Sequence, residues 1–524
     1  MIGTTRNGTT RDRTTKITKT TKSTKSTNDA TTTTISRRQL RVIFVIFVFL
    51  VVPLFAFCLG PLFAQQVPDR SHPPQPGQPP ALHLPAIQKK TLSNGLPLRI
   101  VELHEVPVAQ VNLVILSGAA GDLPRRFGIA SMTAAMLEEG AGSRSALEIA
   151  DAVDYLGADL SATSSMDLSA IRLHVPVARL ADALPIMGDV ALRPTFPRDE
   201  LERLRQQRLT SILQARDDPS AIATAAFPRV LYGTTHRYGT PLYGTAEIIK
   251  TLTPEDLKSF YTGAYRPDSA TLLVVGDVSG DQVLPLVEKQ FGSWKPAAER
   301  PPSQPLPQVA QHASRQIYLI DKPSAAQSQI RIGVVGVPRA TPDYFPLIVM
   351  NTILGGSFTS RLNNNLREQH GYTYGASSAF DMRVSAGPFV AAAGVQTDKT
   401  SEALTEFFKE LEGILKPVPA DELERAKNYV ALRYPGTFET TGDISRRLED
   451  AVLYRLPDDY FEKYVPNIRA VTAADVQRVA QKYVLTGQMA IVIVGDRKVI
   501  EPGIRALNLG PIKLMTVDDV FGPQ

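Results

Sequence analysis

The chain has 524 residues, 43% hydrophobic and 21% charged, which is enough material for two or more globular domains. Its formal net charge of +5 is unevenly placed, because residues 1–64 hold 10 of the 57 Lys and Arg and 2 of the 52 Asp and Glu. Residues 65–524 therefore carry 47 basic and 50 acidic side chains, which argues against a nucleic-acid-binding body. The one cysteine, Cys58, lies in the first segment, so disulfides, iron–sulfur clusters and thiolate zinc sites are excluded from residues 65–524.

The first 64 residues have the pattern of a leader. Residues 1–41 are basic, Thr-rich and without hydrophobic periodicity, which predicts disorder. Val42–Ala64 contains no charged residue and follows Arg37, Arg38 and Arg41. This pattern predicts a signal peptide, and the segment is also long enough for an uncleaved membrane anchor. With either interpretation we expect the rest of the chain to be exported, either periplasmic or anchored to the cytoplasmic membrane facing the periplasm.

Two proline-rich linkers divide the remaining chain into two parts of similar length. The first, residues 65–87, precedes a predicted domain at 88–297. The second, residues 298–312, precedes a predicted domain at 313–515.

Short patterns recur in these two parts at a constant offset of 219 residues. Thr253-x-x-Asp recurs as Thr472-x-x-Asp, and an apolar run that ends in Gly-Asp at 276–277 recurs at 495–496. In each copy the Thr and Asp predict the N-terminus of an amphipathic helix, and the apolar run predicts a buried strand. The sequence therefore predicts an α+β protein built as a tandem duplication of one α/β unit of about 210 residues.

The other predicted elements also correspond between the halves. In each half a strand pair precedes a helix that we expect to end at a glycine, Gly140 or Gly355. The predicted strands are 98–102, 111–116, 316–321 and 329–335, with strand-like runs at 160–175 and 373–387; the predicted helices are 129–138, 346–353, 198–216, 401–415 and 420–434.

The most specific motif is Leu354-Gly-Gly-Ser-Phe-Thr-Ser-Arg-Leu-Asn-Asn-Asn-Leu-Arg-Glu-Gln-His-Gly-Tyr-Thr-Tyr374. With Leu92-Ser-Asn-Gly-Leu and Gly128-Ile-Ala, it makes residues 90–510 resemble the pitrilysin/insulinase family of zinc peptidases, which includes mitochondrial processing peptidase. The resemblance implies the LuxS/MPP-like metallohydrolase fold, with two α/β rolls joined by the proline-rich linker.

Active members of that family carry His-x-x-Glu-His on a first-half helix, where two His bind zinc and the Glu is the general base. Ser131, Ala134 and Ala135 stand at these positions, and Ser211 aligns with the downstream Glu that completes the zinc site. Alanine has no lone pair and one hydroxyl cannot hold Zn²⁺, so we expect no metal in this chain. No two of the seven His lie three to five residues apart, and we interpret Glu138-Glu139 and His370 as capping or solvated helix-end residues.

The resemblance assigns substrate binding to Arg361 and Tyr374. In family members an Arg and a Tyr of the second half donate hydrogen bonds to the substrate backbone near the scissile carbonyl. The alternative is that Arg361 pairs with Glu368 and Tyr374 packs within the sheet. We expect a peptide substrate to be added as an edge strand beside the strand through 160–173.

Three hypotheses of function remain. Some bacterial members of the family combine a zinc-bearing subunit with a zinc-less subunit that keeps the Arg/Tyr pair, and this sequence resembles the second kind. That resemblance implies an exported heterodimeric zinc metallopeptidase whose zinc belongs to the partner. The alternatives are a catalytically inactive homologue with a structural, assembly or binding role, and an independent hydrolase with another site. A serine hydrolase is disfavoured because the sequence contains no G-x-S-x-G.

Overall fold

The computed structural model describes residues 86–296 and 306–523. The predicted leader, nearly all of the first linker and part of the second lie outside these ranges. Within the described ranges no helix is long and apolar enough to cross a membrane. The Val42–Ala64 segment is not among the described residues, so its role as signal peptide or anchor stays a prediction.

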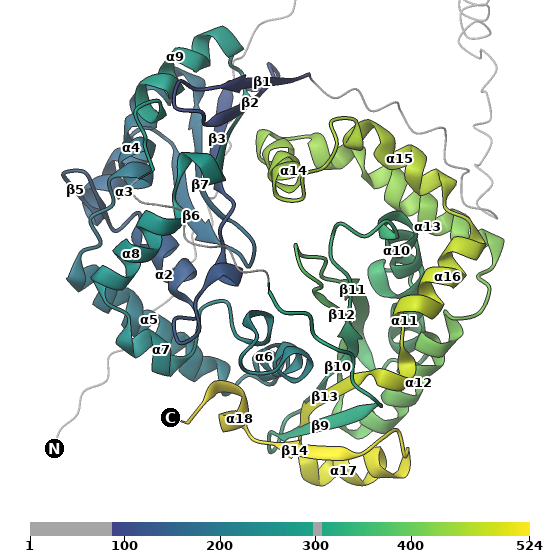
Figure 1. The fold of residues 1–524 in the computed structure, drawn as a ribbon. Helices are drawn as coiled ribbons and strands as arrows, with labels where there is room; N and C mark the ends of the chain where they lie inside the picture. The colour runs from purple at the N-terminus through teal and green to yellow at the C-terminus, as the bar shows by residue number, and fades with distance from the viewer. Residues whose placement is uncertain (1–85, 297–305, 524) are drawn as a thin grey trace, which may run out of the picture. The chain divides into compact units, whose positions relative to one another are not determined.

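The first half forms one six-stranded mixed sheet, with its own helices on one face (Figure 1). The strand order is β1-β2-β8-β3-β7-β6, and only β2 and β8 pair in parallel. Every residue of β8 is buried, as its apolar sequence predicts. The elements are β1 (Ile87–Thr91), β2 (Pro97–Glu102), β3 (Val108–Ile115), α2 (Ile129–Met136), α3 (Ala146–Tyr155), β6 (Asp159–Ser164), β7 (Ser169–Pro176), α4 (Leu180–Leu192), α5 (Arg198–Ala215), α6 (Pro219–Tyr232), α7 (Ala246–Thr251), α8 (Pro254–Ala264), β8 (Ala270–Gly276) and α9 (Gly280–Phe291), with a short ribbon of β4 (Gly140–Ala141) and β5 (Arg144–Ser145).

The second half repeats this sheet, as its sequence predicts. Its order is β14-β9-β13-β10-β12-β11, in which the parallel pair β9–β13 corresponds to β2–β8. The outermost strand differs, because β14 comes from the end of the chain and runs parallel to β9. The elements are β9 (Gln316–Asp321), β10 (Gln327–Val335), α10 (Tyr344–Asn351), α11 (Arg361–Asn363), β11 (Thr373–Phe380), β12 (Pro388–Gln396), α12 (Thr400–Gly413), α13 (Ala420–Arg433), α14 (Thr441–Leu453), α15 (Tyr460–Ala470), α16 (Ala473–Tyr483), β13 (Ala490–Gly495), α17 (Arg497–Ala506), β14 (Ile512–Met515) and α18 (Val517–Phe521).

The repeated local signals form as predicted. Thr253 caps α8 and Thr472 caps α16, and in both cases the Asp three residues later completes the reciprocal capping box. Each helix leads into the central parallel strand of its sheet, β8 or β13. The fold is thus the predicted α+β tandem duplication.

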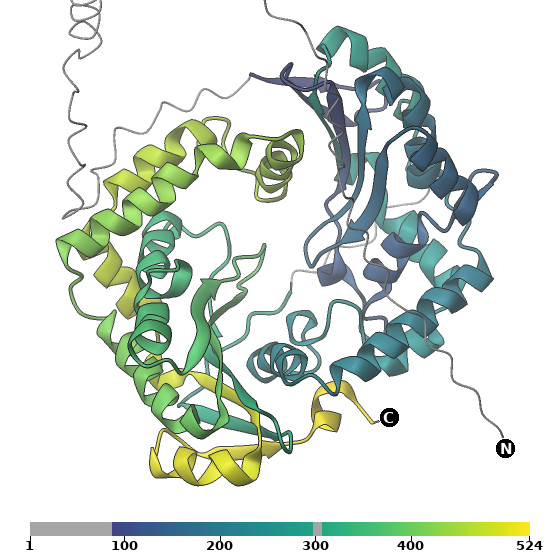
Figure 2. The ribbon, with the colours of Figure 1, turned by 180° about the vertical axis from the view of Figure 1, so that it is seen from behind.

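Each half also contributes one helix to the sheet of the other half. Helix α6 packs against β10 and β13, and its counterpart α14 packs against β3 and β8 (Figures 1 and 2). Glu449 of α14 is 6% exposed and accepts hydrogen bonds from Asn112 at 2.7 Å and from Arg172 at 2.8 and 2.7 Å. A buried carboxylate with these partners ties α14 to the first sheet.

Four local predictions were wrong. The run 160–175 is a hairpin of two strands, because Ser165 and Leu168 form a turn between β6 and β7. Gly140 lies in β4 rather than directly after α2, and Gly355 lies inside the π-helical segment Thr352–Gly356 that continues α10. The run 373–387 is a strand only to Phe380.

Candidate functional site

Helix α2, which carries the positions of the missing zinc motif, is anchored firmly at its N-terminus. The carboxylate of Asp122 accepts hydrogen bonds from the backbone N–H of Gly128 at 2.6 Å and of Ala130 at 3.1 Å. It also accepts two from the guanidinium of Arg237, at 3.1 and 3.0 Å. The side chains are 0% and 2% exposed, and burial raises the pKa of Asp122 although Arg237 acts against that rise.

Gly128 is required at the start of this helix. Its φ is +97°, and a Cβ there would lie 2.4 Å from the carbonyl oxygen of Tyr243. The lost motif therefore sits on a helix whose position is still fixed by a buried ion pair and a close backbone approach.

The four motif positions offer no set of metal ligands. Ser131 and Ala134 are buried, Ala135 is half-buried, and Ser211 is exposed on α5. The hydroxyl of Ser211 donates to the carbonyl of Gln207, one turn earlier on its own helix, at 3.0 Å. The structure thus does not bring Ser211 into contact with Ser131.

A guanidinium contacts Ser131 instead. Nη2 of Arg208, on α5, donates to the carbonyl of Ser131 at 2.8 Å and to its hydroxyl at 3.1 Å. The guanidinium also lies 5.5 Å from the ring centre of Tyr243. Among the described residues no carboxylate pairs with Arg208, and its buried Nη1 has no hydrogen-bond partner there. Burial lowers the pKa of Arg208 to about 10, so it remains a cation at neutral pH.

These residues do not fit a zinc ion. Ser131 and Ala135 replace the two zinc-binding His of α2, and Ala134 replaces the Glu that is the general base. The cation of Arg208 lies against Ser131, where it would repel Zn²⁺. Within residues 86–296 and 306–523, no three His, Cys, Asp or Glu side chains are grouped so that they could hold a metal ion. Sequence patterns missed Arg208, because its contact joins positions 77 residues apart.

Glu138 is not the solvated helix-end residue that the sequence suggested. It is half-buried just after α2, and its Oε1 accepts the backbone N–H of Ala162 on β6. Burial raises its pKa to about 7, although the Ala162 hydrogen bond acts in the opposite direction. Glu139 forms an ion pair with Arg203 at 2.6 Å. The burial of Glu138 could have been predicted from its spacing, because Glu138 follows the motif position Ala134 by about one helical turn and lies on the same face.

Strand β6 is one of the two edge strands of the first sheet. Among the described residues it pairs only with β7, within the predicted 160–173 region. Ala162 directs its N–H away from β7 to Glu138, so the alternate residue Leu160 also directs its backbone groups outward. An extended segment could pair with this edge, and Glu138 already binds one of its donors.

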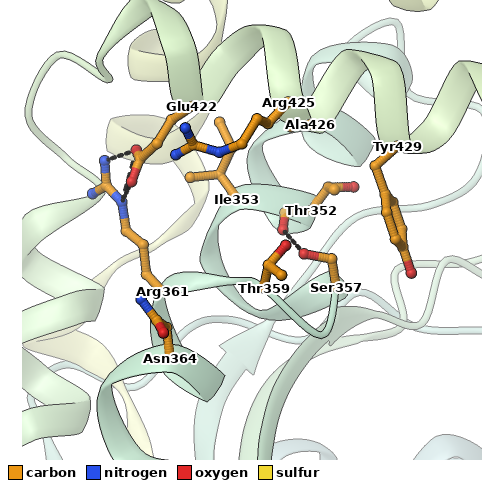
Figure 3. Close-up of a pocket in the computed structure, with 10 residues that line it drawn as sticks. All are labelled: Thr352, Ile353, Ser357, Thr359, Arg361, Asn364, Glu422, Arg425, Ala426 and Tyr429. Atoms are coloured by element: carbon orange, nitrogen blue, oxygen red, sulfur yellow. Dashed lines mark hydrogen bonds and ion pairs between the residues drawn. The ribbon is translucent and has the colours of Figure 1, made fainter. Parts of the chain in front are cut away.

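Arg361 forms an ion pair that the sequence did not predict. At the start of α11, its Nε lies 3.2 and 3.1 Å from the two carboxylate oxygens of Glu422 on α13 (Figure 3). The predicted alternative, a pair with Glu368, is wrong, because Glu368 contacts Arg367 at 3.2 Å. Arg361 and Glu422 line a cavity of about 100 Å³, with Tyr429 at its other end (Figure 3).

Tyr374 lies outside that cavity. Its side chain is 91% exposed, so the alternative of a tyrosine packed within the sheet is wrong. It lies near the start of β11, where the pairing with β12 is irregular between Thr373 and Ala376. The structure therefore does not gather Arg361 and Tyr374 into one cavity, and their shared role in substrate binding stays a prediction.

Arg367 is a second arginine of the same motif. It lies in the π-helical segment Asn364–Gln369, and its guanidinium is 4.5 Å from the ring centre of Phe358, which is 65% exposed. Its Nη1 is close to Glu368 but lacks hydrogen-bond geometry with any described residue. Only the turn at Gly371 separates Arg367 from Tyr374, and the short spacing within the motif could have indicated it.

His370 is exposed and follows directly after the segment Asn364–Gln369, at its C-terminal cap, as the sequence predicts. Its ring stacks on Tyr372 at 5.0 Å, and its Nε2 lies 3.7 Å from a carboxylate oxygen of Glu406. Through these contacts His370 helps to hold the turn between Arg367 and Tyr374 in place.

Two family models match the chain. Residues 100–246 match the model described as insulinase (peptidase family M16), and residues 251–430 match the one described as peptidase M16 inactive domain. The chain belongs to the M16 peptidase family. As an M16 protein it combines a first half without the zinc ligands and a second half that retains the long motif around Arg361 and Tyr374.

M16 relatives from two bacteria match much of the chain. An uncharacterized zinc protease of Mycobacterium tuberculosis is 27% identical over 346 residues, which is 66% of this chain and 78% of that protein. One of Bacillus subtilis is 26% identical over 343 residues, or 65% and 82% of the two chains.

Solved structures have the same fold. The peptidase M16 inactive domain from Pseudomonas fluorescens is 28% identical, with a TM-score of 0.72 over 78% of this chain and 98% of that one. A chain of complex III2 from Candida albicans is 15% identical, with a TM-score of 0.67 over 81% and 100% of the two chains, and this likeness concerns the fold alone.

Proposed function

We propose that this chain is the non-catalytic, substrate-binding subunit of an exported, heterodimeric zinc metallopeptidase that degrades or processes peptides. The observation that carries the proposal is the contact of Arg208 with Ser131. The helix that bears the zinc motif in active relatives is retained and anchored here, while a protein cation lies against its metal-binding face. The zinc and its activated water then belong to a homologous partner that carries His-x-x-Glu-His.

The chain's own groups are suited to holding a peptide. The outward N–H and C=O groups of β6 can pair with an extended backbone, which gives affinity with little demand on sequence. The exposed phenol of Tyr374 can donate a hydrogen bond to a peptide carbonyl brought by the partner. Of the two arginines, Arg361 is held by Glu422, whereas Arg367 lies nearer to Tyr374 in the chain.

The test is co-purification from the native cell followed by reconstitution. We expect the full-length chain to bring down an M16 homologue with His-x-x-Glu-His, and the isolated chain to hydrolyse no peptide. Adding the chain to the separated homologue should raise the kcat/KM for peptide hydrolysis at least about 10²-fold. A homologue that is equally active alone, or recovery of the chain without any such homologue, would contradict the proposal.

A structural or assembly role is the alternative. The likeness to a chain of complex III2 favours it, since a protein of this fold can be part of a larger assembly. The ion pair of Arg361 with Glu422 also favours it, because an arginine held by a carboxylate has less capacity to bind a peptide. On this alternative the chain co-purifies with a complex whose peptidase activity does not depend on Tyr374.

A further inference from the structure

A second and larger cavity, of about 230 Å³, lies in the second half between α10, α13, α14 and α15. Its described lining contains no residue of the first half and neither Arg361 nor Tyr374. We propose that it binds a small aromatic carboxylate, a single flat ring with one carboxylate group attached. This inference does not depend on the proposed peptidase role.

Aromatic rings form the walls of this cavity. The rings of Tyr434 and Tyr464 are stacked at 4.0 Å and are within 5° of parallel. Tyr460 meets Tyr464 edge to face, at 6.0 Å and 71°. A ligand ring can therefore pack either flat or edge-on against the walls, the two arrangements that aromatic pairs prefer.

The charged groups of the lining are mostly cations. Three arginines, Arg339, Arg433 and Arg447, line the cavity together with a single carboxylate, that of Asp450. Burial raises the pKa of Asp450, although Arg447 and Arg339 act against the rise. The lining thus carries more positive than negative charge even with Asp450 ionised, and it favours an anionic ligand.

The three arginines differ in how far their guanidinium groups are already bound by other residues of the protein. The guanidinium of Arg339 lies 3.5 Å from the ring centre of Tyr344 and donates to the hydroxyl of Tyr460 at 2.6 Å. Arg447 donates to Asp450 at 3.3 Å, and its buried Nε has no hydrogen-bond partner among the described residues. Arg433 is exposed, so the cavity reaches the surface beside it, and its Nη1 donates to the hydroxyl of Tyr429 at 2.6 Å while Arg433 forms no ion pair with a described carboxylate. Arg447 and Arg433 are the cations that a ligand can engage.

Shape and chemistry together select the ligand class. A planar guanidinium matches the two oxygens of a carboxylate, and the partly desolvated site strengthens that pair. The volume lies below the usual 300–1,000 Å³ of drug-sized pockets, which fits one ring rather than a nucleotide. Such a group can be a free aromatic acid or the C-terminal aromatic residue of a peptide.

The experiment is isothermal titration of the full-length chain with phenylacetate and with a tripeptide ending in Phe. Benzyl alcohol, which is close in size and uncharged, and the amidated tripeptide are the matched ligand controls. We expect at least one of the two carboxylates to bind, and its uncharged control to bind at least about 10-fold more weakly.

Variants connect binding to the cavity. Arg447→Met and Arg433→Gln should each raise the Kd at least about 10-fold, while Arg446→Met should leave it unchanged. Arg446 is the control because it neighbours Arg447 on α14 but does not line the cavity, and its side chain is 69% exposed. Arg433→Gln keeps the test valid should Arg447→Met fail to fold, since Arg433 is exposed.

Binding of phenylacetate supports a free aromatic acid as ligand, and binding of the peptide alone supports a C-terminal residue. Absence of binding by both carboxylates at millimolar concentration would overturn the proposal. Equal binding of the uncharged controls, or a Kd that neither Arg447→Met nor Arg433→Gln changes, would also overturn it.

Discussion

Helix α2 of the first half and the segment 352–374 of the second half differ in chemistry. Helix α2 carries one hydroxyl and two methyl groups at its motif positions, and its polar groups are satisfied within the protein by Asp122 at its N-terminus and by Arg208 at Ser131. The 352–374 segment departs from α-helical geometry in two π-helical stretches and exposes Phe358 and Tyr374. The difference is that the polar groups of α2 are engaged within the protein, whereas the 352–374 segment leaves large side chains exposed.

The largest expected effect concerns the anchor of α2. Asp122→Ala leaves the buried guanidinium of Arg237 unpaired and removes the acceptor of two backbone N–H groups, so it should destabilise the chain by about 3–5 kcal/mol. The measurement is the free energy of unfolding in urea. The control Asp281→Ala removes an exposed partner of Lys90 and should cost under about 0.5 kcal/mol. Similar losses for the two variants would show that α2 is not anchored as described.

Glu138 predicts a pH dependence specific to the α2 region. Its pKa is about 7 in the folded chain against 4.5 ordinarily, so its contribution to stability is complete below pH 4.5 and is lost as the pH rises through 7. Glutamine is neutral at every pH and keeps an acceptor for Ala162. Glu138→Gln should therefore match the unsubstituted chain near pH 4 and exceed its stability by at most about 3 kcal/mol at pH 8.

Glu148 is the control, because its pKa is shifted in the opposite direction to that of Glu138. Its capping hydrogen bonds with Ser145 lower its pKa, so the stability that it contributes is present above its ordinary pKa and lost as the pH falls. Glu148→Gln should thus become less stable than the unsubstituted chain as the pH rises. Parallel pH profiles for the two variants would contradict the environment described for Glu138.

Substitution of Tyr374 tests the role of the 352–374 segment through the rate of peptide hydrolysis. In the reconstituted heterodimer, Tyr374→Phe should lower kcat/KM on the order of 10²-fold, the effect of removing one donor to a developing oxyanion. Its stability should change by less than about 0.5 kcal/mol, because the side chain is 91% exposed. Tyr372→Phe is the matched control. Equal activity of the Tyr374 variant and the unsubstituted chain would favour the assembly role.

The smallest expected effect is that of Arg361→Ala and Glu422→Ala, which together test whether Arg361 has a structural or a functional role. Arg361→Ala leaves a half-buried Glu422 unpaired and should destabilise the chain by about 1–2 kcal/mol. Glu422→Ala leaves Arg361 without its partner and should destabilise the chain by a similar amount. If the arginine only supports α11, both variants should change reconstituted kcat/KM alike. A loss of activity in Arg361→Ala but not in Glu422→Ala would support the predicted contact of Arg361 with the peptide. Arg367→Ala tests the neighbouring arginine in the same assay.

Much of the fold could be predicted because its signals are local. The capping residues Thr253 and Thr472 and the apolar strands that follow belong to short patterns, and their repetition predicted the duplication. The hairpin turn at Ser165–Leu168 was missed because the small and apolar residues around it suggested one continuous strand. The π-helical stretches carry no simple periodicity and were also missed.

The site was less predictable, since its decisive contacts join distant segments. The absence of zinc ligands is visible in the sequence, but the contact of Arg208 with Ser131 and the pairing of Arg361 with Glu422 depend on how helices pack. Burial of Glu138 against β6 depends equally on tertiary structure. Residue identity predicted which groups exist, and packing decided which of them are already engaged.

The most direct test of the central claim is the zinc content of the full-length chain, purified alone and dialysed against a zinc buffer with its partner absent. Residues at the motif positions predict less than about 0.1 zinc per chain and no peptide hydrolysis with or without a chelator. One tightly held zinc per chain, together with chelator-sensitive hydrolysis by the isolated chain, would contradict the account.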